Sequence, residues 1–342
     1  MEIRPLDNIS NNIPEKTIQD FSIGGFGIRL ELPCRRERVS FGRTFLKFSS
    51  VLSKEPDILI RVQYGKAPKI NLTRKNFLAG VDKWWEFYRS GKDKVFLLYP
   101  VKKKKRYFSI SYKKVMQAGG RSINIKFKRA HDFKSINAIL PLPRRTAVFD
   151  NDFKKGVIYV DCPGGSPLPN PLEYPLLDLM LVELLALSGG IKFHGSGVVD
   201  GGECYLFLGL PGKGKSTISD LWRREALLLN DDRVPVRKKG KSFFAFATPG
   251  NTTVTPRSAK RGFPVNSIFF LQHGKTNRLR RLNLYGALSM FVKSCPIATW
   301  DVSVLKQTIV LFTQMIKNLP CYSLHFVPDR RVLKFIREAL ER

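Results

Sequence analysis

The first 160 residues alternate apolar and polar side chains in short runs, which is the pattern of half-buried β-strands. No strong helical periodicity interrupts these runs. We therefore predict a β-rich N-terminal domain over residues 1–160. The expected strands are FGIRLEL at 26–32, TFLKFSS at 44–50, ILIRVQY at 58–64, VFLLYP at 95–100, YFSISY at 107–112 and INIKFK at 123–128.

Beyond a segment rich in Pro and Gly at 161–172, which we predict to be a linker, strands alternate with helices. This alternation predicts an α/β domain over residues 173–342, so that the chain as a whole is α+β. The expected helices are 174–187, 215–225, 283–294, 302–317 and 329–341, and the expected strands are 191–199, 203–208, 226–230, 267–272 and 321–326.

The segment from Gly209 to Ser216 reads GLPGKGKS and fits the phosphate-binding pattern G-x-x-x-x-G-K-[ST], the Walker A motif. An expected strand directly precedes it and an expected helix directly follows it, which is the context that the motif requires. In such a loop backbone N–H groups face phosphate oxygens, and the helix N-terminus adds positive potential. The predicted nucleotide-binding residues are Gly209, Gly212, Lys213, Gly214, Lys215, Ser216 and Thr217.

Lys215 is expected to reach the β- and γ-phosphates of ATP, and Ser216 to ligand Mg²⁺. Asp231 and Asp232 follow fifteen and sixteen residues after Ser216. A helix of about ten residues carries the chain ~15 Å away, and a parallel strand returns it to the same sheet edge. Two adjacent carboxylates there could divide the work, one holding Mg²⁺ and one accepting a hydroxyl proton. The alternative for the pair is a turn or a cap.

His194 lies on the expected strand 191–199, which a turn near residue 201 joins to the strand 203–208. Antiparallel pairing of these strands places His194 opposite residues 207–209, at the start of the phosphate-binding loop. A site role is therefore predicted for His194, the alternative being a structural histidine.

These residues together resemble the HPr kinase/phosphorylase family, whose fold is related to phosphoenolpyruvate carboxykinases. The matching stretches are FHGSGV at 193–198, LGLPGKGKST at 208–217 and LLLNDDRVPV at 227–236. The resemblance implies a P-loop kinase domain with a mixed sheet. It also implies that Asp231 assists the metal, Asp232 takes the proton of a serine hydroxyl, and His194 supports the acidic pair. Related kinases form oligomers, so the resemblance also allows a homo-oligomer.

One segment departs from that family. Residues 243–265 contain no acidic residue, whereas bifunctional members carry there an acidic residue linked to phosphorolysis. Phosphorolysis, and HPr itself as the acceptor, are therefore not expected. Arg257, Lys260 and Arg261 are candidates for neutralising the transferred phosphate, the alternative being a surface position.

The chain has 59 Lys and Arg against 28 Asp and Glu, a net charge of +31. Residues 101–130 hold eleven of these basic residues and no acidic one, led by the basic run at 102–106. The run is either a docking surface for an acidic partner or the solvated tip of a hairpin. We favour the tip, and predict no nucleic-acid partner, because no stacking aromatic residues are interleaved with the charges.

The function that the sequence predicts is an ATP- and Mg²⁺-dependent kinase for a hydroxyl group on a peptide, protein or small molecule. The alternatives are a nucleotide-gated binding module without phosphotransfer and a nucleic-acid-associated ATPase. The most apolar stretch, 176–187, is too short for a membrane span, and no secretory signal is visible. Five scattered cysteines suit reduced thiols, so a cytoplasmic protein is predicted.

Overall fold

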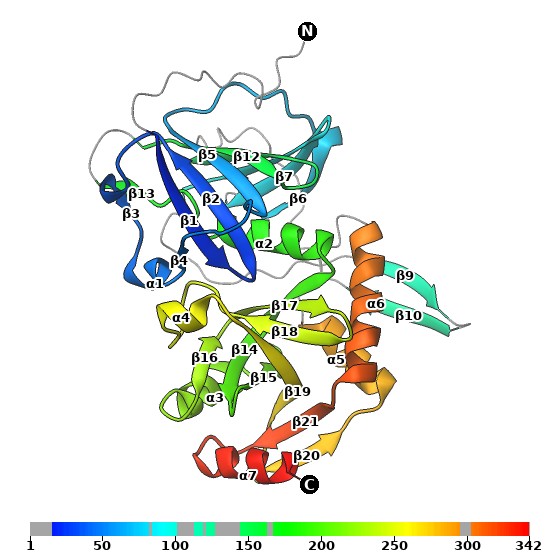
Figure 1. Ribbon diagram of the computed structural model, residues 1–342. Coiled ribbons are helices and arrows are strands. Elements are labelled where there is room, and N and C mark those ends of the chain that lie inside the picture. Colours follow the sequence, from blue (N-terminus) through cyan, green and yellow to red (C-terminus); the bar gives the residue numbers. More distant parts are fainter. Residues whose placement is uncertain are drawn as a thin grey trace.

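The computed structural model describes residues 16–81, 84–100, 113–118, 121–126, 144–162, 167–294 and 302–341. In this part of the chain the fold is mixed α/β, with two large mixed sheets and seven α-helices. Helix α2 (Leu176–Leu187) lies between the two sheets (Figure 1). The basic run at 102–106 and the expected strand 107–112 lie outside the described residues.

The N-terminal sheet has nine strands in the order β4-β1-β2-β5-β12-β11-β8-β7-β6. Strand β5 pairs in parallel with β2 and β12, and the other neighbours are antiparallel. The strands are β1 (Thr17–Ile23), β2 (Phe26–Leu32), β4 (Ser49–Ser50), β5 (Ile58–Tyr64), β6 (Phe77–Val81), β7 (Trp85–Ser90), β8 (Asp93–Leu98), β11 (Arg145–Asp150) and β12 (Lys155–Val160).

Two shorter pairings accompany this sheet. Strand β9 (Lys113–Ala118) forms an antiparallel hairpin with β10 (Arg121–Lys126), which begins two residues before the strand expected at 123–128. Strand β13 (Leu168–Pro169), inside the expected linker, pairs in parallel with β3 (Val39–Ser40). The short 3-10 helices are Arg36–Arg38 and Arg74–Asn76.

The strand expected at 44–50 is wrong. Residues Arg43–Leu46 form the short helix α1, and only Ser49–Ser50 is extended. The reason is the spacing of the aromatic side chains: Phe45 and Phe48 are three residues apart and both buried, which a helical turn allows and an alternating strand does not. Phe45 packs on Phe21 with their ring centroids 5.0 Å apart.

The second sheet contains eight strands. Its two longest strands, β14 and β19, each pair with different neighbours along their first and second halves. Their first halves pair with β17 and β18, and their second halves flank β15, which therefore lies between them. The strands are β14 (Gly190–Asp200), β15 (Glu203–Leu208), β16 (Leu227–Asn230), β17 (Arg233–Lys239), β18 (Ser242–Phe246), β19 (Gly262–His273), β20 (Arg278–Arg281) and β21 (Cys321–Phe326).

Helices cover both faces of this second sheet. Phe269 and Phe270 are neighbours in β19 and belong to different cores, as alternation along a strand requires. Phe269 packs in the core that α3 (Lys215–Trp222) and α7 (Arg331–Leu340) close. Phe270 packs on Phe291 of α5 (Leu284–Ser294), beside α6 (Val302–Asn318). The remaining helix, α4, is Pro256–Ala259.

The two sheets share one continuous hydrophobic core. At the turn between β1 and β2, the amide of Gly24 donates to the carbonyl of Ala247 at 3.2 Å. The Arg237 guanidinium lies 4.1 Å from the ring centroid of Phe26. The boundaries at 160 and 173 stay a prediction. Among the described residues, no helix is both long and apolar enough to cross a membrane, and the four described cysteines are free thiols.

Candidate functional site

The segment between β15 and α3 has the strand–loop–helix order that the sequence predicts. Two of its glycines, Gly212 and Gly214, have φ of 79° and 92°, in the left-handed region that favours glycine. A Cβ atom on Gly214 would also lie 2.7 Å from the ring of Phe326. The tight path of the loop into the helix therefore depends on glycine at position 214.

Lys215 begins α3 and is buried, and its ammonium turns back over the loop. Its Nζ donates to the carbonyl oxygens of Gly209 at 2.9 Å and Leu210 at 3.3 Å. Burial lowers the pKa of Lys215. The next two residues, Ser216 and Thr217, are exposed at the start of the helix. The predicted loop residues thus present a cation and two accessible hydroxyls at one helix N-terminus.

Asp231 and Asp232 lie at a bend between β16 and β17, and the topology around them differs from the prediction. Strand β16 does not pair with β15; it pairs antiparallel with β14, which lies between the two. Both β16 and β17 follow β14, so that Arg233 faces His194 and Asn230 faces Gly197. The aspartates interrupt one long line of pairing instead of ending a strand beside the loop.

This topology still brings the aspartates and the loop together, through Gly195 of β14. On one side Gly195 pairs with Leu208, the last residue before the loop. On the other side its amide donates to the carbonyl of Asp232 at 3.1 Å. A Cβ atom on Gly195 would lie 2.4 Å from Leu208 Cδ2, so this crossing point has no room for a side chain.

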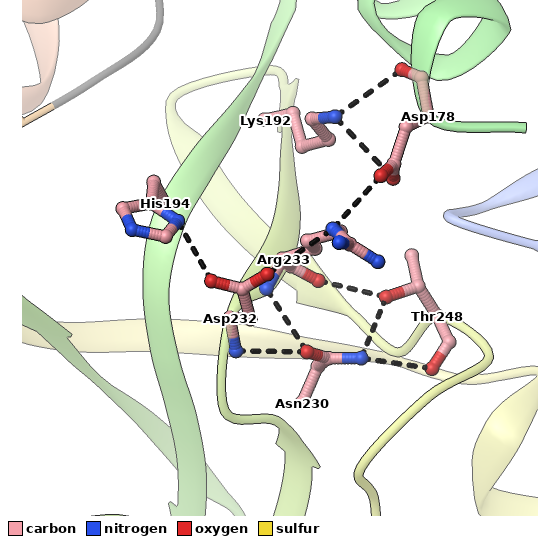
Figure 2. Close-up of polar contacts among 7 residues, drawn as sticks. All are labelled: Asp178, Lys192, His194, Asn230, Asp232, Arg233 and Thr248. Carbon is pink, nitrogen blue, oxygen red and sulfur yellow. Dashed lines mark hydrogen bonds and ion pairs between the residues drawn. The ribbon is translucent and has the colours of Figure 1, made fainter. Parts of the chain in front are cut away.

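Asn230 fixes the bend, and sequence reasoning missed it (Figure 2). Its Oδ1 accepts from the amides of Asp232 at 2.8 Å and Arg233 at 2.9 Å. Its Nδ2 donates to the carbonyl of Thr248 at 3.2 Å, while the Thr248 hydroxyl donates to the carbonyl of Arg233 at 2.7 Å. Asn230 and Thr248 are eighteen residues apart, so only a buried polar residue directly before the aspartates could have signalled this network.

His194 and Asp232 are in direct contact, as Figure 2 shows: Nδ1 of His194 lies 2.8 Å from Oδ1 of Asp232. The hydrogen bond from His194 lowers the pKa of Asp232, and the charges of Arg233 and Lys215 act in the same direction against the opposing effect of burial. Asp232 is therefore ionised at neutral pH and lies within the electrostatic field of the loop lysine.

Asp231 has different neighbours. Its carboxylate accepts a hydrogen bond from Nδ2 of Asn251, and Oδ1 of Asn251 accepts from Arg223 at 3.0 Å. No group of three or more His, Cys, Asp or Glu side chains gathers for a metal ion among the described residues. Mg²⁺ commonly takes one or two carboxylates together with substrate phosphates and water. The accessible oxygens of Ser216 and Asp231 suit that kind of donor set.

Three further charged residues border His194 and Asp232, and the sequence pattern did not indicate their role. Nε of Arg233 lies 2.8 Å from Asp178 and 3.2 Å from Asp232. Lys192, two residues before His194 on β14, lies 3.3 Å from Asp178. The available signal was Asp178 itself, a carboxylate in the first turn of α2, whose residues are apolar apart from Asp178 and Glu183.

A cavity of about 560 Å³ adjoins this cluster, and its lining includes His194 and Asp232. By contrast, Arg257, Lys260 and Arg261 are exposed around α4. In the described part of the chain, none of the three contacts the loop or the aspartates through a hydrogen bond or ion pair. The Arg261 guanidinium lies 5.4 Å from the Phe263 ring centroid.

No protein-family model and no curated protein sequence matches this chain. Among solved structures, the Hpr(Ser) kinase/phosphatase from Coxiella burnetii is similar, with a TM-score of 0.26 and 11% sequence identity. The match covers 44% of this chain and 99% of that chain. So low a TM-score adds no weight, and the function has to be inferred from the motif and from the contacts around it.

Proposed function

We propose that this chain is an ATP-dependent kinase of the HPr-kinase-like type, which transfers the γ-phosphate of ATP to a hydroxyl group. The observation that carries the proposal is the arrangement around Gly195. A glycine-rich loop with a buried lysine lies on one side of β14, and an ionised Asp232 held by His194 lies on the other. Residues 173–342 form the catalytic unit, and phosphorolysis is not part of the proposal.

In the proposed reaction the loop amides and Lys215 hold the phosphates of ATP. The acceptor hydroxyl oxygen attacks the γ-phosphorus and forms an O–P bond, while the bond from the γ-phosphorus to the β–γ bridging oxygen breaks. The hydroxyl proton passes to the Asp232 carboxylate, and ADP leaves. His194 orients that carboxylate and keeps it ionised. Arg233, at 3.2 Å from Asp232, compensates part of its negative charge.

Mg²⁺ would be held by Ser216 and Asp231 together with phosphate oxygens, and when bound it supplies charge neutralisation on the phosphates. Asn251 orients the Asp231 carboxylate for this task by its hydrogen bond. The two aspartates thus have separate supports, His194 for one and Asn251 for the other, which favours separate roles.

The test is transfer of radiolabel from γ-labelled ATP, with Mg²⁺, to serine-containing peptides, proteins and small hydroxyl compounds. A kinase releases ADP only as fast as label appears on the acceptor. Lys215→Ala should weaken ADP binding about tenfold or more, because the main side-chain cation on the phosphates is lost. Lys241→Ala, an exposed lysine in the turn between β17 and β18, is the control and should bind normally. Equal affinity in the wild type and Lys215→Ala would contradict the proposal.

A nucleotide-gated binding module is the second candidate, because a phosphate-binding loop with Lys215 at its end serves nucleotide binding whether or not a phosphate is transferred. Such a module would bind ADP and ATP alike and label no acceptor. Acceptor-dependent turnover separates the two functions directly.

A further inference from the structure

The cavity beside Asp232 is built from both halves of the chain. His194 and Asp232 come from the second sheet, whereas Trp85 is the first residue of β7 in the N-terminal sheet and Trp84 directly precedes it. Its volume of about 560 Å³ lies within the range of small-molecule sites, roughly 300–1,000 Å³. A folded protein could cover the mouth of such a cavity but could not enter it.

Part of the cavity lining is aromatic and apolar. The rings of Trp84 and Tyr174 lie 5.6 Å apart at 55°, and the Arg233 guanidinium lies 4.2 Å from the Tyr174 centroid. Leu179 of α2 extends the same lining. Tyr174 is 48% exposed although its ring is large, so this part of the lining offers aromatic surface to a ligand. Aromatic groups bury large areas and pack against other rings in offset or edge-to-face arrangements, so these two rings suit a ligand with a ring.

The described part of the lining also includes a buried polar group without a partner and an excess of positive charge. Ser294, the last residue of α5, is only 5% exposed, and among the described residues its hydroxyl has no hydrogen-bond partner. Buried hydroxyls are almost always bonded, so this one points to a ligand atom. Lys293 is exposed and forms no ion pair with any acidic side chain in the described part of the chain. Among the described residues, the side chains that line the cavity include three Lys or Arg and two Asp.

We propose that this cavity binds the phosphate acceptor, and that the acceptor is a small hydroxyl compound with a flat apolar body and a negative charge. The flat body lies against Trp84 and Tyr174, the anionic group faces Lys293 and Ser294, and the hydroxyl reaches Asp232. This inference rests on the proposed kinase function, which supplies the role of Asp232. The inference also assigns a role in acceptor binding to the N-terminal sheet, because the two tryptophans belong to that part of the chain.

The first experiment compares three probes on the full-length chain. N-benzoyl-L-serine carries the ring, the hydroxyl and the carboxylate; N-acetyl-L-serine lacks the ring, and N-benzoyl-L-serinamide lacks the charge. Calorimetry without nucleotide should show N-benzoyl-L-serine binding at least about tenfold more tightly than either control. With labelled ATP it should also be the best acceptor of the three. Equal binding of all three probes, or binding of none, overturns the assignment.

The second experiment uses substitutions in the cavity. Trp84→Ala and Ser294→Ala should each weaken N-benzoyl-L-serine binding, by about tenfold for the tryptophan and somewhat less for the serine, with ADP affinity unchanged. Tyr285→Ala removes an aromatic side chain that is 78% exposed outside the cavity and should change neither affinity. Normal probe binding in both cavity variants overturns the inference.

The failure of this inference and that of the kinase proposal are distinguishable. If label passes from ATP only to peptides or proteins, and Trp84→Ala leaves that transfer intact, the acceptor is macromolecular and the cavity assignment is wrong while the kinase stands. If ADP does not bind the wild type, the kinase proposal fails, and the calorimetry without nucleotide still decides whether the cavity takes the probe.

Discussion

At the scale of single residues, the environment of Asp232 decides which chemistry it can perform. A carboxylate with a lowered pKa is a weak base. It is nevertheless ionised at neutral pH, and only the ionised form can accept a proton. His194 contributes the largest part of that lowering, by a 2.8 Å contact. Asp231 is bonded instead to the amide of Asn251, which leaves its charge available to a cation.

Asparagine substitutions separate the two aspartates. Asp232→Asn keeps the size of the side chain but cannot accept a proton, and a general base contributes about 10²–10⁴-fold in rate. We expect it to bind Mg²⁺–nucleotide within roughly tenfold of wild type and to transfer phosphate at least about a hundredfold more slowly. Asp231→Asn should mainly weaken the Mg²⁺-dependent part of nucleotide binding, because an amide is a poorer magnesium ligand. Single-turnover rates and Mg²⁺ titrations measure both effects, and an exchange of the two phenotypes would reverse the assignment.

His194→Ala tests the positioning role through pH. The ionised form of Asp232 is the active one, so the rate is present above its pKa and lost as pH falls through it. The ordinary pKa of an aspartate is near 3.9. The acid limb of the wild-type rate should lie below that pH, and loss of the His194 hydrogen bond should move the limb to higher pH. Single-turnover rates against pH measure the limb. His273→Ala, at an exposed position that ends β19, is the control; a limb that stays in place in both variants would contradict the role.

At the scale of elements, the local sequence pattern was sufficient where a short alternating or apolar run lies between clear turns. The strands at 26–32, 58–64, 203–208 and 321–326 have the expected bounds, and the helix after the phosphate-binding loop begins at the expected residue. The local sequence pattern failed where contacts with residues distant in sequence determine the backbone conformation. The helical turn at Phe45 depends on Phe21, and the bend at Asp231 depends on pairing with β14 and on Thr248.

The entry of the loop into α3 offers a matched pair of glycines. Gly212→Ala meets nothing within 4 Å, so it should cost only the strain of a left-handed residue, about 1–2 kcal/mol. Gly214→Ala has the same strain and also meets Phe326, so overpacking should add about 1–3 kcal/mol. Urea unfolding measures both costs, and ADP affinity should fall more for Gly214→Ala. Equal stability of the two variants would show that Phe326 moves aside freely.

At the scale of the whole molecule, the two sheets depend on α2, which lies between them and carries charge into a buried region (Figure 1). Nζ of Lys94 on β8 lies 2.7 Å from Oε2 of Glu183 on α2, and both side chains are less than a tenth exposed. The Lys94 ammonium also lies 5.0 Å from the ring centroid of Phe153. One buried ion pair therefore links the N-terminal sheet to the helix whose first turn holds Asp178 and Leu179 beside the cavity.

This pair is the subject of a double-mutant cycle. Removal of one partner leaves the other charge buried and should cost about 3–5 kcal/mol, whereas replacement of both by apolar side chains should cost far less. We expect Lys94→Met and Glu183→Leu each to be strongly destabilising in urea unfolding, and the double variant to recover most of the loss. Because α2 borders the cavity, the single variants should also weaken N-benzoyl-L-serine binding while ADP binding, which depends on β15 and α3, is retained. Additive losses in the double variant would mean that the two side chains act independently and that the pair does not hold the sheets together.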